Sequence, residues 1–145
     1  MISKKIALIS GLVALILFGI KPNALEVASD PFKEPTVIRC TCYIDNGTTA
    51  SGKQTKDGVI AGRKEWLGCV AMLYAVNEDG SIGDFIGYYE FLDTGAGIDT
   101  DGDGKGDSII NGTSVDVWRP TLDDAKSWVN TYGDYVYIKI VRGVG

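Results

Sequence analysis

Short runs of alternating apolar and polar residues, separated by turn-forming residues, constrain the fold of this chain more than any other feature. Such runs are typical of half-buried β-strands, whose successive side chains point to opposite faces of a sheet. In the last run, for example, Val136, Ile138 and Ile140 alternate with two tyrosines and a lysine. The predicted strands are residues 37–43, 59–61, 69–76, 85–92, 114–118 and 135–141.

The segment after residue 120 predicts the one helix. Thr121 is placed as its N-cap, with Asp124 three residues later, and Gly133 ends it. An apolar stripe with helical spacing consists of Leu122, Ala125, Trp128, Val129 and Tyr132. About six short strands and one late helix in a small domain predict a mainly β fold. A closed or nearly closed barrel would dispose of exposed strand edges.

The N-terminus has the pattern of an export signal. Lysines flank an uncharged apolar run, residues 6–20, which is short for a bilayer span. Residues 1–29 are therefore predicted to be a signal peptide, and an uncleaved N-terminal anchor helix is the alternative. The protein is expected to be secreted or in the cell envelope. It would contact a membrane only through residues 1–21, if these are retained.

The rest of the chain is predicted to hold one domain. Residues 30–36, which contain two of the four prolines, are predicted to be a tether, and residues 37–145 form the domain. Without residues 1–29, which hold three of the 14 basic and one of the 19 acidic side chains, the net charge is −7. Nucleic acid is a poor partner for so acidic a chain, because its phosphates attract basic proteins.

Two aspartates on predicted strands are the first candidates for catalysis. The chain contains no histidine, so carboxylates are the groups expected to transfer protons near neutral pH. Asp93 ends one apolar run, and Asp116 lies inside another, facing away from Val115 and Val117. If one sheet contains both strands, the carboxylates converge on one concave surface, as general acid/base catalysis requires. The alternative is that both aspartates only cap turns.

The loop between these strands has the spacing of a calcium-binding loop. Acidic residues fall at positions 1, 3, 5 and 9 of an EF-hand-like pattern, with a glycine at position 6 and a carbonyl at position 7. These residues are Asp99, Asp101, Asp103, Gly104, Lys105 through its carbonyl, and Asp107. Position 12 is Ile110, so the bidentate glutamate is absent. A structural Ca²⁺ site is predicted, and an acidic insertion without a ligand is the alternative.

A series of short motifs extends these observations over residues 37–141. In chain order they are Cys42-Tyr43, Thr49-Ala50-Ser51-Gly52, Gly58-Val59-Ile60-Ala61, Leu67-Gly68, Asp93-Thr94-Gly95, Ile110-Asn111-Gly112, Val115-Asp116-Val117-Trp118 and Pro120. Together they resemble the three-aspartate (3D) domain. That domain belongs to the double-psi β-barrel group, with the rare lipoprotein A-like domain and the catalytic part of membrane-bound lytic transglycosylase A.

The resemblance implies a six-stranded double-psi barrel with a glycan-binding groove and a role in peptidoglycan cleavage or remodelling. It implies that Asp93 is the catalytic acid/base and that Asp116 supports it. Tyr43 and Thr49 are implied partners of a sugar or a carboxyl group. Trp66 and Trp118 are candidates for stacking on a sugar ring, with burial in the core as the alternative.

The third aspartate of the family, normally in an Asp-Pro pair, is missing. Arg63-Lys64-Glu65 stands there, so either Glu65 replaces it or the site works with two aspartates. The family pattern favours a lytic transglycosylase, in which one carboxyl acts as acid and then base while the sugar's 6-hydroxyl replaces water. Such an enzyme requires no cofactor and acts on the glycan strands of peptidoglycan.

Other classes of protein remain as alternatives to an enzyme. A non-catalytic wall-binding or protein-binding module is the main alternative, since fold does not determine function. A secreted protease inhibitor or structural protein would not explain the aspartate pair.

The family fold brings the segments of Cys42 and Cys69 near one another, which implies a disulfide between them, whereas Cys40 lies too close in sequence to Cys42. The alternative is three reduced, buried thiols.

Overall fold

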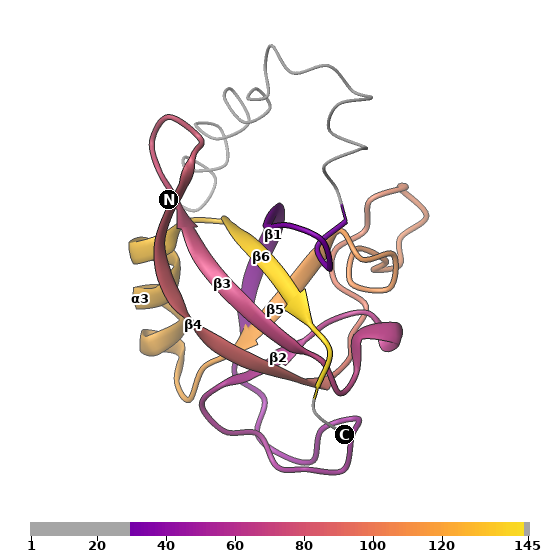
Figure 1. The fold of residues 1–145 in the computed structure, drawn as a ribbon. Helices are drawn as coiled ribbons and strands as arrows, with labels where there is room; N and C mark the ends of the chain where they lie inside the picture. Colours follow the sequence, from indigo (N-terminus) through magenta and orange to yellow (C-terminus); the bar gives the residue numbers. More distant parts are fainter. Residues whose placement is uncertain (1–29, 144–145) are drawn as a thin grey trace.

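Six strands join edge to edge into a closed barrel in the computed structural model, which describes residues 30–143 (Figure 1). They are β1 (Thr36–Tyr43), β2 (Val59–Ala61), β3 (Val70–Val76), β4 (Ile82–Asp93), β5 (Ser114–Trp118) and β6 (Tyr135–Val141). Their order around the barrel is β1-β5-β2-β4-β3-β6. The pairs β1–β5 and β2–β4 are parallel, and the other pairs are antiparallel. The predicted mainly β barrel is confirmed.

The predicted signal or anchor segment, residues 1–29, lies outside the described residues. Within residues 30–143, no helix is both long and apolar enough to cross a bilayer.

Strand boundaries follow the local sequence closely: β1 and β3 differ from the predicted bounds by one residue, and the largest difference is in β4. The predicted bounds of β2, β5 and β6 agree with the structure, but β4 begins at Ile82, three residues before the predicted start. A tight turn extends the hairpin, because the backbone N–H of Asn77 donates to the carbonyl of Ser81 at 2.9 Å. Ile82 can then pair with Val76. The β3–β4 hairpin therefore projects beyond the barrel (Figure 1).

The helix α3 (Leu122–Tyr132) packs against β1 and is capped as predicted. The backbone N–H of Asp124 donates to the Thr121 hydroxyl at 3.1 Å. Gly133 follows the last turn with a positive φ of 81°. One member of the predicted stripe is misplaced: Leu122 remains 55% exposed, because the first turn of α3 extends past the core.

The barrel interior holds a core of inward-facing side chains. Those that are completely buried include Ile60, Leu73, Phe91, Val115, Val117, Val136 and Ile138. Gly62 is required beside this core, because a Cβ there would lie 2.4 Å from the Phe91 ring. Trp66 packs on the same ring at a centroid distance of 5.5 Å.

The predicted tether, residues 30–36, is instead part of the domain. The backbone N–H of Ile140 on β6 donates to the carbonyl of Pro31 at 2.8 Å, and Phe32 packs against the core. The Arg142 guanidinium lies 4.8 Å from the centre of the Phe32 ring. These contacts extend the domain to Asp30, and composition alone did not predict them.

Candidate functional site

The two candidate aspartates lie in one row across the outer face of four neighbouring strands. Thr41 pairs with Asp116, Asp116 pairs with Ala61, and Ala61 pairs with Asp93. Paired residues on neighbouring strands point to the same face. Because Val117 faces the interior, Asp116 faces outward. The β2–β4 register shifts between Ile60 and Ala61, and the bond from the Tyr43 hydroxyl shows that Asp93 reaches the same face. The predicted convergence of Asp93 and Asp116 on one surface therefore agrees with the register, with only the small side chain of Ala61 between them.

Asp93 is held by three hydrogen-bond donors. The backbone N–H groups of Ala50 and Thr94 each donate to Asp93 Oδ1 at 3.0 Å. The Tyr43 hydroxyl donates to Asp93 Oδ2 at 2.9 Å. Because bonds are accepted on both oxygens, the Asp93 carboxyl is held in one orientation. Sequence reasoning did not identify Ala50, whose backbone contribution leaves no residue-specific signal.

Asp116 has a different environment. The Thr41 hydroxyl donates to its Oδ1 at 2.9 Å, and among the described residues no group donates to Oδ2. Burial raises the pKa of Asp116 from its ordinary value of 3.8 to about 6, against the effect of the Thr41 bond. The nearby carboxylates of Asp45 and Asp93 raise this pKa further. The two aspartates thus differ: Asp93 accepts three hydrogen bonds, whereas Asp116 can hold a proton in weakly acidic conditions.

The raised pKa of Asp116 predicts a pH dependence of stability. Between pH 4 and pH 6 the folded chain binds more protons at this residue than the unfolded chain, so stability falls as pH rises through that window. Relative to Asp116→Asn, the wild type should lose about 2–3 kcal/mol of unfolding free energy between about pH 4 and pH 7. Urea denaturation of both proteins across this range measures the difference. A constant difference would show that Asp116 ionises normally.

Tyr43 connects the row to a small apolar cluster on the same face. Its ring packs with Val59, Leu92 and Trp118, while its hydroxyl reaches Asp93 across β5 and β2. Burial and the bond to Asp93 both raise the pKa of Tyr43, so its hydroxyl remains a donor. The predicted role of Tyr43 as a carboxyl partner fits this geometry.

Thr49 and Glu65 flank the row without joining it. Thr49 is buried, and its hydroxyl donates to the carbonyl of Lys53 at 2.7 Å, so it shapes the loop that presents Ala50. Glu65 is exposed and pairs with Arg63 at 3.0 Å. It lines a cavity of about 500 Å³ together with Ala50, and this cavity also contacts Thr94. The centre of the row is occupied by Ala61, and no third acid stands there.

The two tryptophans proposed for sugar stacking are buried. Trp66 is 7% exposed and Trp118 is 6% exposed. The Trp118 indole N–H donates to the carbonyl of Asp45 at 2.8 Å, and the Trp66 ring lies against Phe91. This burial favours the core alternative over sugar stacking for both rings.

The implied disulfide between Cys42 and Cys69 is absent, because all three cysteines are free. Cys42 pairs with Val117 on β5, whereas Cys69 is bonded through its carbonyl to Phe91 on β4. Burial raises the pKa of Cys42 to about 12, so its thiol remains protonated.

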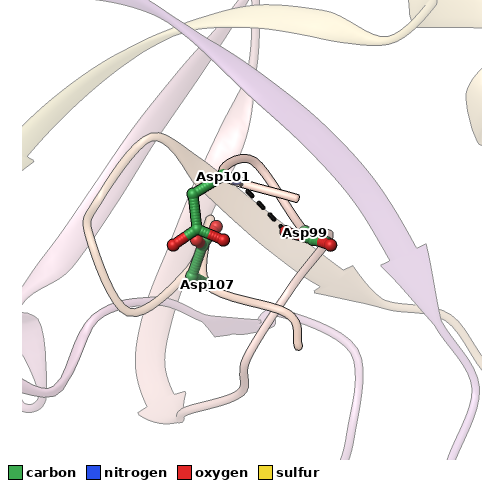
Figure 2. Close-up of side chains that lie close together, drawn as sticks. All are labelled: Asp99, Asp101 and Asp107. Atoms are coloured by element: carbon green, nitrogen blue, oxygen red, sulfur yellow. Dashed lines mark hydrogen bonds between the residues drawn. The ribbon is translucent and has the colours of Figure 1, made fainter. Parts of the chain in front are cut away.

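The acidic loop brings three of its predicted ligands together. One carboxylate oxygen from each of Asp99, Asp101 and Asp107 lies within 4.8 Å of the others (Figure 2). Asp103 lies outside this group, and its carboxylate accepts the backbone N–H of Lys105 at 2.8 Å. Asp99 accepts three backbone N–H bonds, from Asp101, Gly102 and Gly104. The bond from Gly104 has the largest effect in lowering the pKa of Asp99. The arrangement offers hard oxygen ligands, the type that Ca²⁺ prefers.

The fold and site define a six-stranded mixed β-barrel with an aspartate pair on its outer face. No protein-family model matches the chain, and no curated protein matches it. Among solved structures, Streptomyces papain inhibitor (SPI) is similar, with a TM-score of 0.51 and 15% sequence identity. The match covers 79% of this chain and 100% of that chain. At this identity the similarity establishes a shared fold.

Proposed function

We propose that this protein is an exported, peptidoglycan-cleaving enzyme of the lytic transglycosylase type, acting on the β-1,4 links between N-acetylmuramic acid and N-acetylglucosamine. The observation that carries the proposal is the outer-face row, in which an aspartate with a pKa of about 6 lies near an aspartate held by three donors. Paired carboxylates in different environments are the usual equipment for cleaving glycosidic bonds. The chemistry requires no cofactor.

The proposed finer class of the fold is the double-psi barrel of the three-aspartate group. Two parallel pairs, β1–β5 and β2–β4, within a closed six-stranded barrel support it. The motif order in the sequence supports the same class.

The environments of the two aspartates favour a division of roles opposite to the one that the sequence resemblance implies. Asp116 donates its proton to the glycosidic oxygen as the bond to the anomeric carbon breaks. The Asp93 carboxyl, held in place by its three donors, stabilises the positive charge that develops on the sugar ring. The Asp116 carboxylate then takes the proton of the sugar's own 6-hydroxyl, which attacks the anomeric carbon and closes a 1,6-anhydro ring. Asp93 cannot easily be the donor, because three groups already donate to it.

Incubation of the purified protein with peptidoglycan tests the proposal. Mass spectrometry should detect 1,6-anhydro-muropeptides in the soluble fraction. If the protein sediments with peptidoglycan but releases none, it is a binding module. That second candidate is favoured by one observation, the alanine at the centre of the aspartate row. An assay of papain with and without the same preparation tests whether this protein inhibits papain, the activity named for the structural neighbour.

We also propose that the acidic loop binds Ca²⁺ as a structural ion. The cluster of Asp99, Asp101 and Asp107 supports this, since close carboxylates repel one another without a cation. Added Ca²⁺ should raise the melting temperature of the wild type and should have no effect on Asp101→Asn. Asp103→Asn is the matched control, because it removes the same charge outside the cluster, and it should keep most of the response. If calorimetric titration of the wild type with Ca²⁺ gives no heat of binding and its melting temperature does not rise, the proposal is contradicted.

A further inference from the structure

A second cavity, of about 600 Å³, is separate from the aspartate row and has no role in the proposed chemistry. It forms where the segment before β1, the short 3-10 helix η1 (Lys64–Trp66) and the segment before β5 meet. Its walls include Asp30, Phe32, Ile38, Arg63, Trp66 and Thr113. The volume lies within the range of about 300–1,000 Å³ that small-molecule sites occupy.

Residues of opposite charge, Arg63 and Asp30, line this cavity together with apolar side chains. Arg63 uses its Nε to bind Glu65 at 3.0 Å, and its two terminal nitrogens donate to no group among the described residues. Asp30 Oδ2 has only a loose pair with Lys33, at 3.9 Å. The buried side chains of Trp66 and Ile38 also line the cavity, and the Arg63 guanidinium lies 6.0 Å from the centre of the Trp66 ring. These features fit a ligand that carries a carboxylate and an amino group on a partly apolar body, which describes a short peptide.

The short helix η1 contributes residues both to this cavity and to the 500 Å³ cavity beside the donors of Asp93. Arg63 lines the 600 Å³ cavity, and its ion-pair partner Glu65 lines the 500 Å³ cavity on the other side of η1. That second cavity is also lined by Ala50 and Thr94, whose N–H groups hold Asp93. A polymer bound at the aspartates can therefore place a side branch at Arg63.

We infer that the Arg63 cavity binds the peptide attached to a peptidoglycan glycan strand, with a peptide carboxylate on Arg63 and an amino group toward Asp30. The inference rests on the proposed function, because it takes the glycan at the aspartate row as its starting point. Gly112 supports the arrangement of Arg63. A Cβ there would lie 3.0 Å from Arg63 Cδ, and the φ of +81° also favours glycine.

Calorimetric titration with muramyl tripeptide ending in lysine tests the inference, because this probe has carboxylates and an amino group but no bond for the enzyme to cleave. The wild type should bind it, and Arg63→Gln should weaken binding at least about tenfold through loss of a charge-assisted contact. Asp30→Asn should also weaken binding. Lys126→Gln is the matched control, because it removes the same charge from an exposed position on α3 that lines neither cavity. Its affinity should equal that of the wild type.

The outcomes separate this inference from the proposed function. Equal affinity of wild type and Arg63→Gln, or no binding by the wild type, overturns the inference whatever the enzyme assay shows. Arg63-dependent binding without release of anhydro-muropeptides supports the peptide site and counts against the catalytic proposal. Melting temperatures of the variants exclude unfolding as the cause of lost binding, and Arg63→Lys, which keeps the charge, should recover part of the affinity.

Discussion

Asp116→Asn is expected to reduce the release of 1,6-anhydro-muropeptides by at least about a hundredfold, the usual effect of removing a general acid/base. Asparagine keeps the shape of the side chain but cannot donate and recover the proton. In the wild type, the rate should fall as pH rises above about 6, because Asp116 then loses the proton that it must donate. Rates measured from pH 4 to pH 8 test both expectations.

Asp93→Asn should behave differently. It removes a negative charge that raises the pKa of Asp116, so the falling limb of the pH profile should move to lower pH. Asp123→Asn is the matched control, because Asp123 is exposed on the first turn of α3, and it should have wild-type activity. If Asp93→Asn abolishes activity while Asp116→Asn keeps the wild-type profile, Asp93 is the acid and the proposed division of roles is wrong.

Trp118→Ala is expected to lower the free energy of unfolding by about 3–5 kcal/mol, the typical cost of deleting a buried tryptophan. Trp118 is 6% exposed, packs with Val59 and Leu92, and bonds the carbonyl of Asp45. The loss should also loosen Tyr43, which packs on the same cluster and holds Asp93. Urea denaturation at constant pH measures the change.

Tyr88→Ala is the control for Trp118→Ala, because it deletes another large aromatic ring that is 65% exposed. Its stability should lie within about 0.5 kcal/mol of the wild type. A Trp118→Ala protein with normal stability and selectively weakened glycan binding would favour the sugar-stacking role and would contradict the burial of this ring.

Local features of the sequence were sufficient for most secondary structure. The period-two pattern of β6 and the cap at Thr121 each depend on residues within a few positions of one another, so propensity and spacing determined them. The same holds for the placement of Asp116 opposite to Val117, since alternation along one strand needs no partner. The shift at the start of β4 arose from turn hydrogen bonds that composition does not specify.

A mainly β domain, the strands that carry Asp93 and Asp116, and the helix after them could all be predicted from local sequence patterns. The position of Ala61 between these aspartates, the burial of Trp118 and the bond from Tyr43 to Asp93 emerge only from the folded barrel. Local patterns cannot reveal such contacts, because Tyr43 and Asp93 are 50 residues apart and meet only when the barrel closes in the order β1-β5-β2-β4-β3-β6.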